Sequence, residues 1–513
     1  MGGAAFGLKL GAMAVLLVGT AFAAQRADPT SPYSVTVVDE TTQRGVPMVT
    51  LTTVHHVEYV TDSAGVAVLR EPPGRWFYTV ESPGYEFQKD GFGFRGRALE
   101  VRPGGRDVLK LRRTQPAERL YRVTGADRYR DTLDAGLTPP VPGSELKARV
   151  LGSDSVVNAV LGGRLFWFWG DTLRPEYPLG NFHVPGATSR LPLDGGLAPD
   201  RGVELDYALD ANGFARETAH LPGEGPTWIT GLFVLKEGGR ERLFGFYSKV
   251  RGFLEAYERG LIEFDPQEFV WKKVAPFPLK APATPGGHTF LGSSTGSPAE
   301  SGPQYVYFCN PFPNVRVRAT LDAVRSPAAY ETFGCLPAGK TVPTSDRHGR
   351  AHYAWRRGAP TVSPADELRF IRERKLARSD ALFLPSASGR DGARRDLQLA
   401  AGSVNWNAYR RRFVMIAVQL KGASMLGEVW YLEADRPEGP WVNARKVATH
   451  TRYSFYNPRQ HPYFDARDGR RIYFEGTYSQ MFSGGERFVP RYDYNQLMYA
   501  LDLDGRLLDL PAR

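Results

Sequence analysis

Short apolar stretches recur along the later part of the chain, each following a charged or glycine-containing turn. The first lies in RLFWFWGDTLRPEYPLGNF at residues 164–182, where a run of aromatic residues precedes Gly170 and Asp171. A short apolar run bounded by turn residues is typical of a buried β-strand. The other four are GGRERLFGFYSKV (238–250), SGPQYVYFCNPF (301–312), AYRRRFVMIAVQL (408–420) and DGRRIYFEGTYS (468–479).

Units of this kind predict strands repeated around an axis, as in a β-propeller, whose four-stranded blades pack against their neighbours. Long loops between strands account for the uneven spacing, because lengthening a loop costs little free energy. One or two ordinary β-sandwiches, whose strands also follow charged turns, are the alternative. We therefore predict a five-bladed propeller over residues 146–508.

If the five stretches are the second strands of the blades, the innermost strands lie just before them, at residues 151–160, 225–235, 286–295, 401–409 and 456–465. Innermost strands line the central channel of a propeller, where small molecules bind. This ring presents Asp154, Glu224, Trp228, His288, Asn405, Trp406, Asn457, Arg459 and His461, with Asp171 and Glu475 at the ends of adjacent strands.

One helix is predicted inside the propeller. Ser363-Pro364-Ala365-Asp366 places a capping serine before a proline at the first helical position, and ELRFIRERKLA follows. We expect this helix as an insertion between the third and fourth blades.

Residues 32–113 predict a small β-domain that ends in a hairpin, LEVRPGGRDVLKLRR, around Gly104-Gly105. Its segments Gly45-Val46-Pro47, TDSAG (61–65) and Pro83-Gly84-Tyr85 resemble those of carboxypeptidase-regulatory-like, transthyretin-type or Ig-like β-sandwiches. The resemblance implies a spacer or adhesion module without chemistry of its own. Residues 114–145, which end in the proline-rich LTPPVPGS, predict a linker. The predicted fold class is thus all-β.

The N-terminus has the pattern of an export signal. Lys9 precedes an apolar stretch at residues 10–18, and Ala21-Phe22-Ala23 is a cleavage motif, so residues 1–24 are expected to be removed. The apolar stretch is too short for a comfortable membrane span, and a retained anchor is the alternative. We expect a periplasmic or secreted protein with no integral span. An oxidising compartment permits a disulfide between Cys309 and Cys335, and two buried free thiols are the alternative.

Charge narrows the choice of partners. The 513 residues carry a formal net charge of +10, but the cations are scattered and show no dense basic run with interleaved aromatic residues. Nucleic acid is therefore not a predicted partner. A mildly basic surface favours acidic glycans or simply aids solubility, and the sequence leaves that choice open.

Carboxylates with aromatic neighbours suit glycoside hydrolysis. One carboxylic acid protonates the leaving oxygen, and another carboxylate activates water or attacks the sugar. Asp154, Asp171 and Glu475 are the candidates, and Glu475 interrupts an apolar strand, which predicts a raised pKa. The chain has no HExxH zinc-protease motif. No cofactor is predicted, and a structural Ca²⁺ ion is left open.

Several segments together resemble the five-bladed propeller glycosidase superfamily: GSDSV, FWFWGDT, GSVNWNAYRRRF, GEVWYLEADRPEGPW, YNPRQHPYF and IYFEGTYS. The last five are similar to a poorly characterised exported bacterial branch, near the endo-D-arabinofuranosidases and more distantly the arabinanase and xylosidase propellers. The resemblance implies Asp154 as base or nucleophile, Glu475 as acid with Glu224 as its rival, and Asp171 as an orienting group.

The sequence thus predicts an exported protein that cleaves a polysaccharide or cell-wall glycan. A non-catalytic glycan-binding or surface propeller is the first alternative, because aromatic platforms and hydrogen-bond donors suffice for binding. A polysaccharide lyase is the second, with Tyr453 or His461 as its base.

Overall fold

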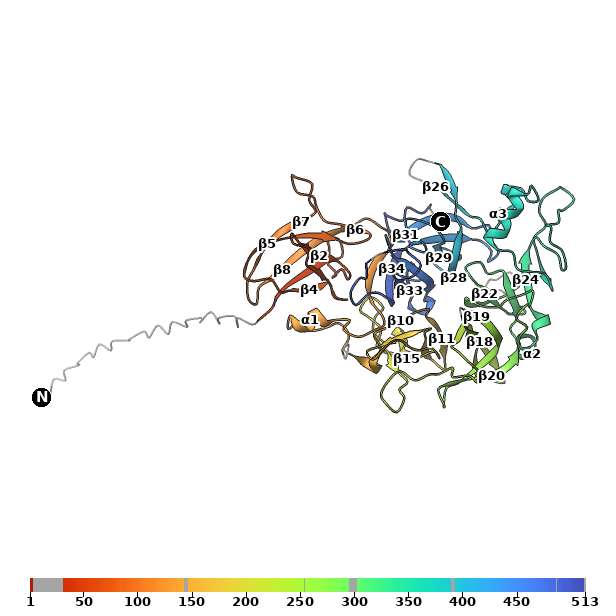
Figure 1. Ribbon diagram of the computed structural model, residues 1–513, viewed down its shortest axis with the longest axis horizontal. Coiled ribbons are helices and arrows are strands. Elements are labelled where there is room, and N and C mark those ends of the chain that lie inside the picture. Colours follow the sequence, from red (N-terminus) through yellow and green to blue (C-terminus); the bar gives the residue numbers. More distant parts are fainter. Residues whose placement is uncertain are drawn as a thin grey trace.

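The computed structural model describes residues 1–2, 31–142, 146–252, 254–294, 302–388, 393–485 and 487–511. The expected signal segment and its cleavage motif lie outside these residues, apart from the first two. Two groups of sheets follow one another along the chain, a small N-terminal pair and a larger ring (Figure 1).

The N-terminal pair encloses one hydrophobic core, which includes Val35, Leu51 and Tyr78. One sheet has the order β4-β1-β8-β6 and the other β3-β2-β5-β7. The strands are β1 (Tyr33–Asp39), β2 (Thr50–Thr53), β3 (Glu58–Val60), β4 (Val66–Leu69), β5 (Gly74–Glu81), β6 (Tyr85–Glu86), β7 (Gly96–Val101) and β8 (Arg106–Arg113).

The hairpin expected around Gly104-Gly105 is wrong. Strand β7 pairs with β5 and strand β8 pairs with β1, so the turn carries the chain from one sheet to the other. Each sheet buries one face against the opposite sheet. The packing of the two sheets face to face determines that β7 and β8 belong to different sheets. A local turn motif does not reveal this packing.

The ring consists of five consecutive sheets, the arrangement of a β-propeller. The first contains β11 (Val157–Leu161), β12 (Arg164–Phe168), β15 (Gly186–Arg190) and β16 (Asp206–Tyr207). The second contains β17 (Thr227–Glu237), β18 (Arg240–Arg251), β19 (Glu255–Asp265) and β20 (Val270–Pro276). The third contains β21 (His288–Gly292), β22 (Tyr305–Cys309), β23 (Val315–Arg318), β24 (Glu331–Gly334) and β25 (Ala354–Arg357).

The last two sheets complete the ring. The fourth contains β28 (Leu399–Asn407), β29 (Arg412–Gln419), β30 (Glu428–Ala434) and β31 (Val442–Thr449), and the fifth contains β32 (Ser454–Gln460), β33 (Arg471–Ser479), β34 (Asn495–Asp502) and β9 (Glu118–Arg122). Smaller sheets are formed by β10 (Gly152–Ser153), β13 (Thr172–Arg174) and β14 (Tyr177–Asn181), and by β26 (Ser386–Ser388) and β27 (Arg394–Asp396). The five stretches identified in the sequence are the second strands β12, β18, β22, β29 and β33, as predicted.

A separate hydrophobic cluster fills each interface between neighbouring sheets. The aromatic run of β12 shows how one strand serves two interfaces, because successive side chains point to opposite faces. Phe166 and Phe168 pack toward the second sheet, whereas Trp167 and Trp169 pack toward the fifth. Cys309 and Cys335 are both free thiols buried in one cluster between the third and fourth sheets.

Strand β9 lies in the segment expected to be a linker. It pairs with β34 in antiparallel register, with Arg122 opposite Leu497, so a strand from before the ring completes the fifth sheet. The same segment contains α1 (Arg130–Asp134), and the Asp62 carboxylate accepts a hydrogen bond from the Thr132 backbone amide at 2.7 Å. The described residues of this segment, 114–142, therefore contribute to both groups of sheets.

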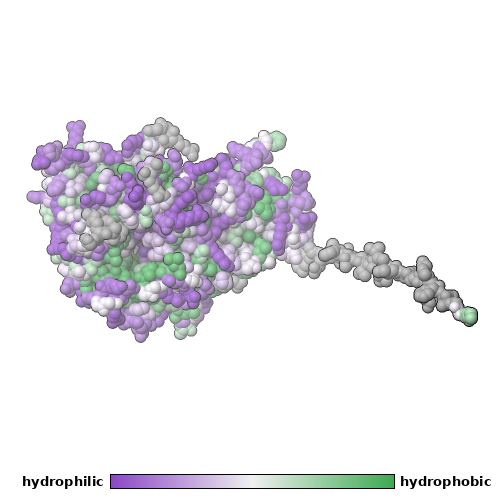
Figure 2. All heavy atoms as spheres, turned by 180° about the vertical axis from the view of Figure 1, so that it is seen from behind, coloured by the Kyte–Doolittle hydropathy of each residue, from purple (hydrophilic) through white to green (hydrophobic). Residues whose placement is uncertain are grey.

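Helix α3 (Pro364–Arg372) lies between the third and fourth sheets, as predicted, and α2 (Leu321–Arg325) follows β23. Figure 2 shows the opposite side of the molecule from Figure 1, with hydrophilic groups over much of this face and hydrophobic groups gathered between them. In the described part of the chain, no helix is long and apolar enough to span a bilayer.

Candidate active site

Asp154 and Asp171, here called the carboxylate pair, lie side by side in the first sheet region. Asp154 sits between β10 and β11, and Asp171 directly precedes β13. The Asp154 amide donates to the Asp171 carbonyl at 3.2 Å, and the Gly170 amide donates to the Asp154 carbonyl at 2.9 Å. A β-carbon on Gly170 would lie 2.1 Å from Asp154 Oδ1, so a larger residue in the WGD turn would displace the Asp154 carboxylate.

Three aromatic residues hold the pair. Tyr456 from β32 donates its hydroxyl to Asp154 Oδ2 at 3.0 Å, and Tyr494 makes a second side-chain hydrogen bond to Asp154. Trp228 from β17 donates its indole N–H to Asp171 Oδ1 at 3.1 Å. The first, second and fifth sheets therefore meet at the pair.

Burial and the neighbouring Asp171 charge together raise the pKa of Asp154 to about 7, against the hydrogen bonds from Tyr456 and Tyr494 that lower it. Burial also raises the pKa of Asp171, while the Trp228 hydrogen bond lowers it. Both side chains remain partly exposed. The pair can therefore hold one proton near neutral pH, with Asp154 as the protonated partner.

The turn after Asp154 is strained and firmly held. Ser155 and Asn457 have φ values of 51° and 50°, a left-handed conformation that L-residues rarely adopt. The Asn457 amide donates to Ser155 Oγ at 2.7 Å, and the Ser155 backbone amide donates to Thr477 Oγ1 at 2.9 Å. Strain of this kind persists only where the surroundings fix it, and it is concentrated at functional sites.

A second cluster of polar side chains, here called the buried network, lies between the first, third and fifth sheets and is more buried than the carboxylate pair. Arg459 donates to the Asn158 carbonyl at 2.7 Å and lies 3.2 Å from His288 Nδ1. His461 Nε2 lies 3.0 Å from Glu475 Oε1. The members of the network are Asn158, His288, Arg459, His461, Tyr463 and Glu475.

The charge state of the network follows from its burial. Burial raises the pKa of Glu475 to about 8, whereas the Arg459 charge opposes that shift. Burial and the same arginine hold the pKa of His461 well below its usual range. At neutral pH His461 is therefore neutral and the Glu475 carboxyl is protonated. Arg459 is then the charged member of the network.

The position of Glu475 does not support the role of acid that the sequence suggested. Its side chain is completely buried in the middle of β33, against His461, which is also completely buried. A catalytic acid must come within hydrogen-bonding distance of the leaving oxygen. Glu475 instead pairs with His461, which directly follows β32, the strand that carries Arg459.

Other predicted residues are distributed around the ring. Glu224 is exposed in the loop before β17, and Asn405 lies 3.5 Å from Gln460 Oε1. Trp406 packs edge-on against Phe413 in the core between sheets rather than facing the carboxylate pair. The buried Tyr453 donates its hydroxyl to the Arg487 carbonyl at 3.0 Å and is thus engaged in the fold.

Sequence reasoning missed four residues of these sites. Tyr456 and Tyr463 stand within the YNPRQHPYF segment, and Asn158 is a polar residue in the apolar run VVNAV, so each carried a signal. Tyr494 precedes β34 in a loop, and no local pattern points to it.

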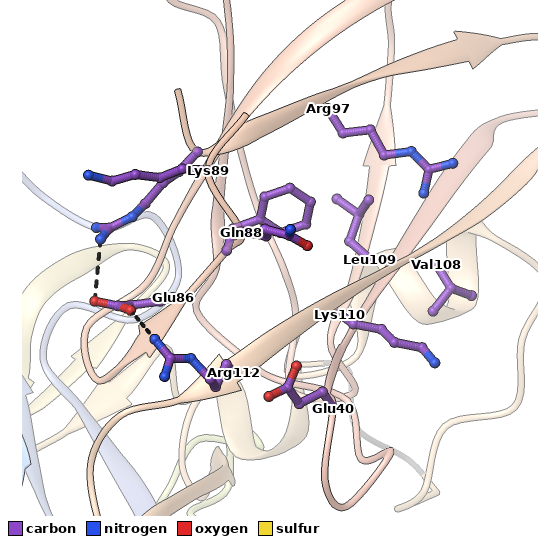
Figure 3. A pocket seen from close by; sticks show the side chains of 11 residues that line it. Glu40, Glu86, Gln88, Lys89, Arg97, Val108, Leu109, Lys110 and Arg112 are labelled. Carbon is purple, nitrogen blue, oxygen red and sulfur yellow. Dashed lines mark hydrogen bonds and ion pairs between the residues drawn. The ribbon is translucent and has the colours of Figure 1, made fainter. Parts of the chain in front are cut away.

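A basic groove of about 770 Å³ lies on the N-terminal sheets, apart from the carboxylate pair. Figure 3 shows Lys89, Arg97 and Lys110 around it. Glu86 accepts hydrogen bonds from Arg95 at 3.3 Å and Arg112 at 2.7 Å. Cations therefore outnumber carboxylates along this groove.

Comparison with known proteins gives relatives only by structure, since neither a family model nor a curated protein matches the chain. A Bacteroides ovatus protein described only as a hydrolase has 14% identity and a TM-score of 0.42, covering 72% of this chain and 90% of its own. An exo-1,5-α-L-arabinanase from a bovine ruminal metagenomic library has 12% identity and a TM-score of 0.34, covering 68% and 92%.

An exo-β-1,3-galactanase from Phanerochaete chrysosporium has 11% identity and a TM-score of 0.34, covering 69% of this chain and 61% of its own. Likeness at this level does not define an activity.

Proposed function

We propose that this protein is an exported hydrolase that cleaves glycans with the carboxylate pair, on a five-bladed propeller preceded by a carboxypeptidase-regulatory-like β-sandwich. The observation that carries the proposal is two adjacent, partly exposed carboxylates, with Asp154 held by Tyr456 and Asp171 held by Trp228, and burial raises the pKa of Asp154. Glycoside hydrolysis requires one protonated and one ionised carboxyl group at the scissile bond.

The surroundings of the two carboxyl groups set the proposed roles. Asp154 holds its proton near pH 7 and donates it to the leaving oxygen, instead of acting as the base that the family resemblance implied. Asp171, oriented by Trp228, acts as the base or nucleophile. Trp228 and Asn457 are partly exposed beside the pair and are the proposed contacts to the sugar. Hydrolysis by paired carboxylates needs no cofactor, and none is proposed for it.

The basic groove favours an acidic glycan. The groove should bind sugars that carry carboxylate groups more tightly than neutral sugars. The cations of Lys89, Arg97 and Lys110 attract anions over several ångströms. We therefore expect uronate-containing polysaccharides such as pectins to be bound more tightly than neutral arabinans, with a difference that shrinks as salt is added.

The test is release of reducing sugar from a panel of acidic and neutral polysaccharides. Asp154→Asn and Asp171→Asn should each lower kcat by at least about 100-fold, the usual contribution of a positioned acid or base. Asp206→Asn, which changes an exposed carboxylate of the same sheet, is the matched control and should retain activity. Wild-type activity that survives both substitutions at the pair would overturn the proposal.

One observation favours glycan binding without cleavage as the second candidate. In β11, β17, β21, β28 and β32, the first strands of the five described sheets, the only carboxylate is that of Glu237, at the far end of β17 from Trp228. No release of sugar, together with retained binding of one glycan by wild type and Asp154→Asn, would establish this alternative.

A further inference from the structure

Three metal-ligating side chains converge outside the carboxylate pair and the buried network. His183 lies between β14 and β15, and Glu217 and His220 lie before β17. One ligand atom from each lies within 4.8 Å of the others. His220 Nδ1 is 2.5 Å from Glu217 Oε2, and the rings of His183 and His220 are 4.5 Å apart between centroids. We call these three residues the histidine cluster.

Backbone pairing holds the two segments of the cluster together. The Ala219 amide donates to the His183 carbonyl at 2.9 Å, and the Thr218 amide donates to the Val184 carbonyl at 3.0 Å. Pro185 and Glu217 form an isolated antiparallel bridge. The backbone positions of the three ligands are therefore fixed by main-chain hydrogen bonds rather than by a flexible loop.

We propose that the histidine cluster binds one Zn²⁺ ion through His183, Glu217 and His220. Two imidazoles and one carboxylate are a donor set that zinc accepts, with the fourth position of its tetrahedron left for water. The side chains of His220 and Glu217 are 67% and 40% exposed, which gives the ion a path from solvent. Nothing in the proposed hydrolysis uses these residues.

One positive charge opposes the ion. The ammonium group of Lys249 acts on His183, but it is held by the carbonyls of Leu221 and Gly225 at 3.2 and 2.8 Å. These carbonyls hold the ammonium group in place, and the Glu217 carboxylate offsets its charge from inside the cluster itself. As a direct ligand, this carboxylate would act on the ion at shorter range than the lysine.

The ion would fasten the start of β17. The Thr227 amide donates to the carbonyl of Phe182 at 3.0 Å, and Trp228 follows Thr227 directly. Phe182 directly precedes His183, and residues 217–220 precede β17 in the chain. An ion bound to His183 and to the 217–220 segment would therefore restrain both segments that lie next to the start of β17. Zinc should therefore raise the melting temperature of the protein, since a ligand that binds only the folded state stabilises it.

The test uses protein purified without a histidine tag and stripped with a chelator. Calorimetric titration with Zn²⁺ should show one equivalent bound by wild type, and Co²⁺ in its place should give visible absorption bands of a low-coordinate site. Glu217→Gln and His220→Ala should each lose that equivalent and the rise in melting temperature. Their melting temperatures in chelator should equal that of wild type, which separates loss of the site from misfolding.

His55→Ala/His56→Ala, which removes an adjacent pair of exposed histidines elsewhere, is the matched control and should keep the bound equivalent. Failure of wild type to bind zinc would overturn the proposal, and so would one equivalent that persists in Glu217→Gln and His220→Ala. Neither outcome bears on the carboxylate pair, so the two proposals stand or fall separately.

Discussion

At the scale of single residues, the hydrogen bond from Tyr456 to Asp154 sets where the proposed acid loses its proton. The bond stabilises the ionised carboxylate and so lowers its pKa. Tyr456→Phe removes the donor, and the pKa of Asp154 should rise by up to about one unit, since one unit corresponds to about 1.4 kcal/mol.

If Asp154 is the acid, activity requires its protonated form. The alkaline limb of the pH dependence of kcat/KM, expected near pH 7 in wild type, should therefore move to higher pH in Tyr456→Phe. Tyr305→Phe, in the third sheet, is the control and should leave the limb in place. A limb that does not move in Tyr456→Phe would contradict the assignment of Asp154.

Glu475 gives a second prediction, in stability rather than activity. Its pKa rises from 4.5 to about 8 on burial, so the folded state binds this proton more tightly than the unfolded state. Stability should therefore fall as pH increases from about 5 to 8, because the unfolded chain releases the proton first. Glu475→Gln removes the titration, and its melting temperature should change less over this interval.

The comparison with wild type separates the effect of Glu475 from that of other titrating groups. A pKa raised by more than one unit should change the free energy of unfolding by more than about 1.4 kcal/mol over this pH interval. Glu224→Gln, at an exposed site, should follow wild type at each pH. Equal pH dependence in wild type and Glu475→Gln would show that the carboxyl is ionised in the folded protein.

Single residues also mark the limit of sequence reasoning. The pattern singled out Asp154 and Asp171, because polar residues next to apolar strands are visible in one dimension. It ranked Glu475 with them for the same reason, yet Glu475 lies inside a sheet, and its partner His461 directly follows the neighbouring strand β32. Tyr494 reaches Asp154 only through the closure of the ring, a contact that no local pattern encodes.

At the scale of elements, α3 shows local sequence and tertiary structure in agreement. Ser363 Oγ accepts from the Asp366 amide at 3.2 Å, and the Asp366 carboxylate accepts from the Ser363 amide at 3.0 Å. This reciprocal cap is written in the sequence, which is why the start of the helix could be predicted. The strand pairing of β7 and β8 could not, because it depends on which layer each strand covers.

Ser363→Ala should weaken α3 by about 1 kcal/mol, the usual cost of losing a capping side chain. Amide hydrogen exchange in the first turns of α3 should accelerate by about fivefold if exchange occurs through local opening. Ser363→Thr keeps the hydroxyl and should exchange nearly as wild type does. Uniform acceleration throughout the fourth sheet would instead indicate that the helix opens only with the whole domain.

At the scale of the whole molecule, β9 joins the two groups of sheets. Arg119 in this strand donates to the carbonyls of Pro47 and Pro83 at 3.1 Å each, while its backbone pairs with β34. One strand thus contacts the N-terminal sheets with a side chain and the ring with its main chain. The boundary drawn from the sequence at residue 146 separates β9 from the sheet that it completes.

A fragment that starts at residue 146 should therefore be less stable than one that starts at residue 114 and more inclined to aggregate. Without β9, β34 becomes an unpaired edge, and exposed edges associate with other chains. Thermal unfolding by circular dichroism and light scattering at equal concentration would compare the two fragments. Equal melting temperatures and equal scattering would show that β9 is dispensable for the ring.

The pairing of Arg122 with Leu497 also limits when the ring can close during synthesis of the chain. Synthesis proceeds at roughly 5 to 20 residues per second, so β9 leaves the ribosome tens of seconds before its partner β34 exists. During that interval the ring cannot close, however stable the finished protein is. The yield of correctly folded chains therefore depends on whether β9 avoids pairing with other strands or other chains until β34 has been synthesised.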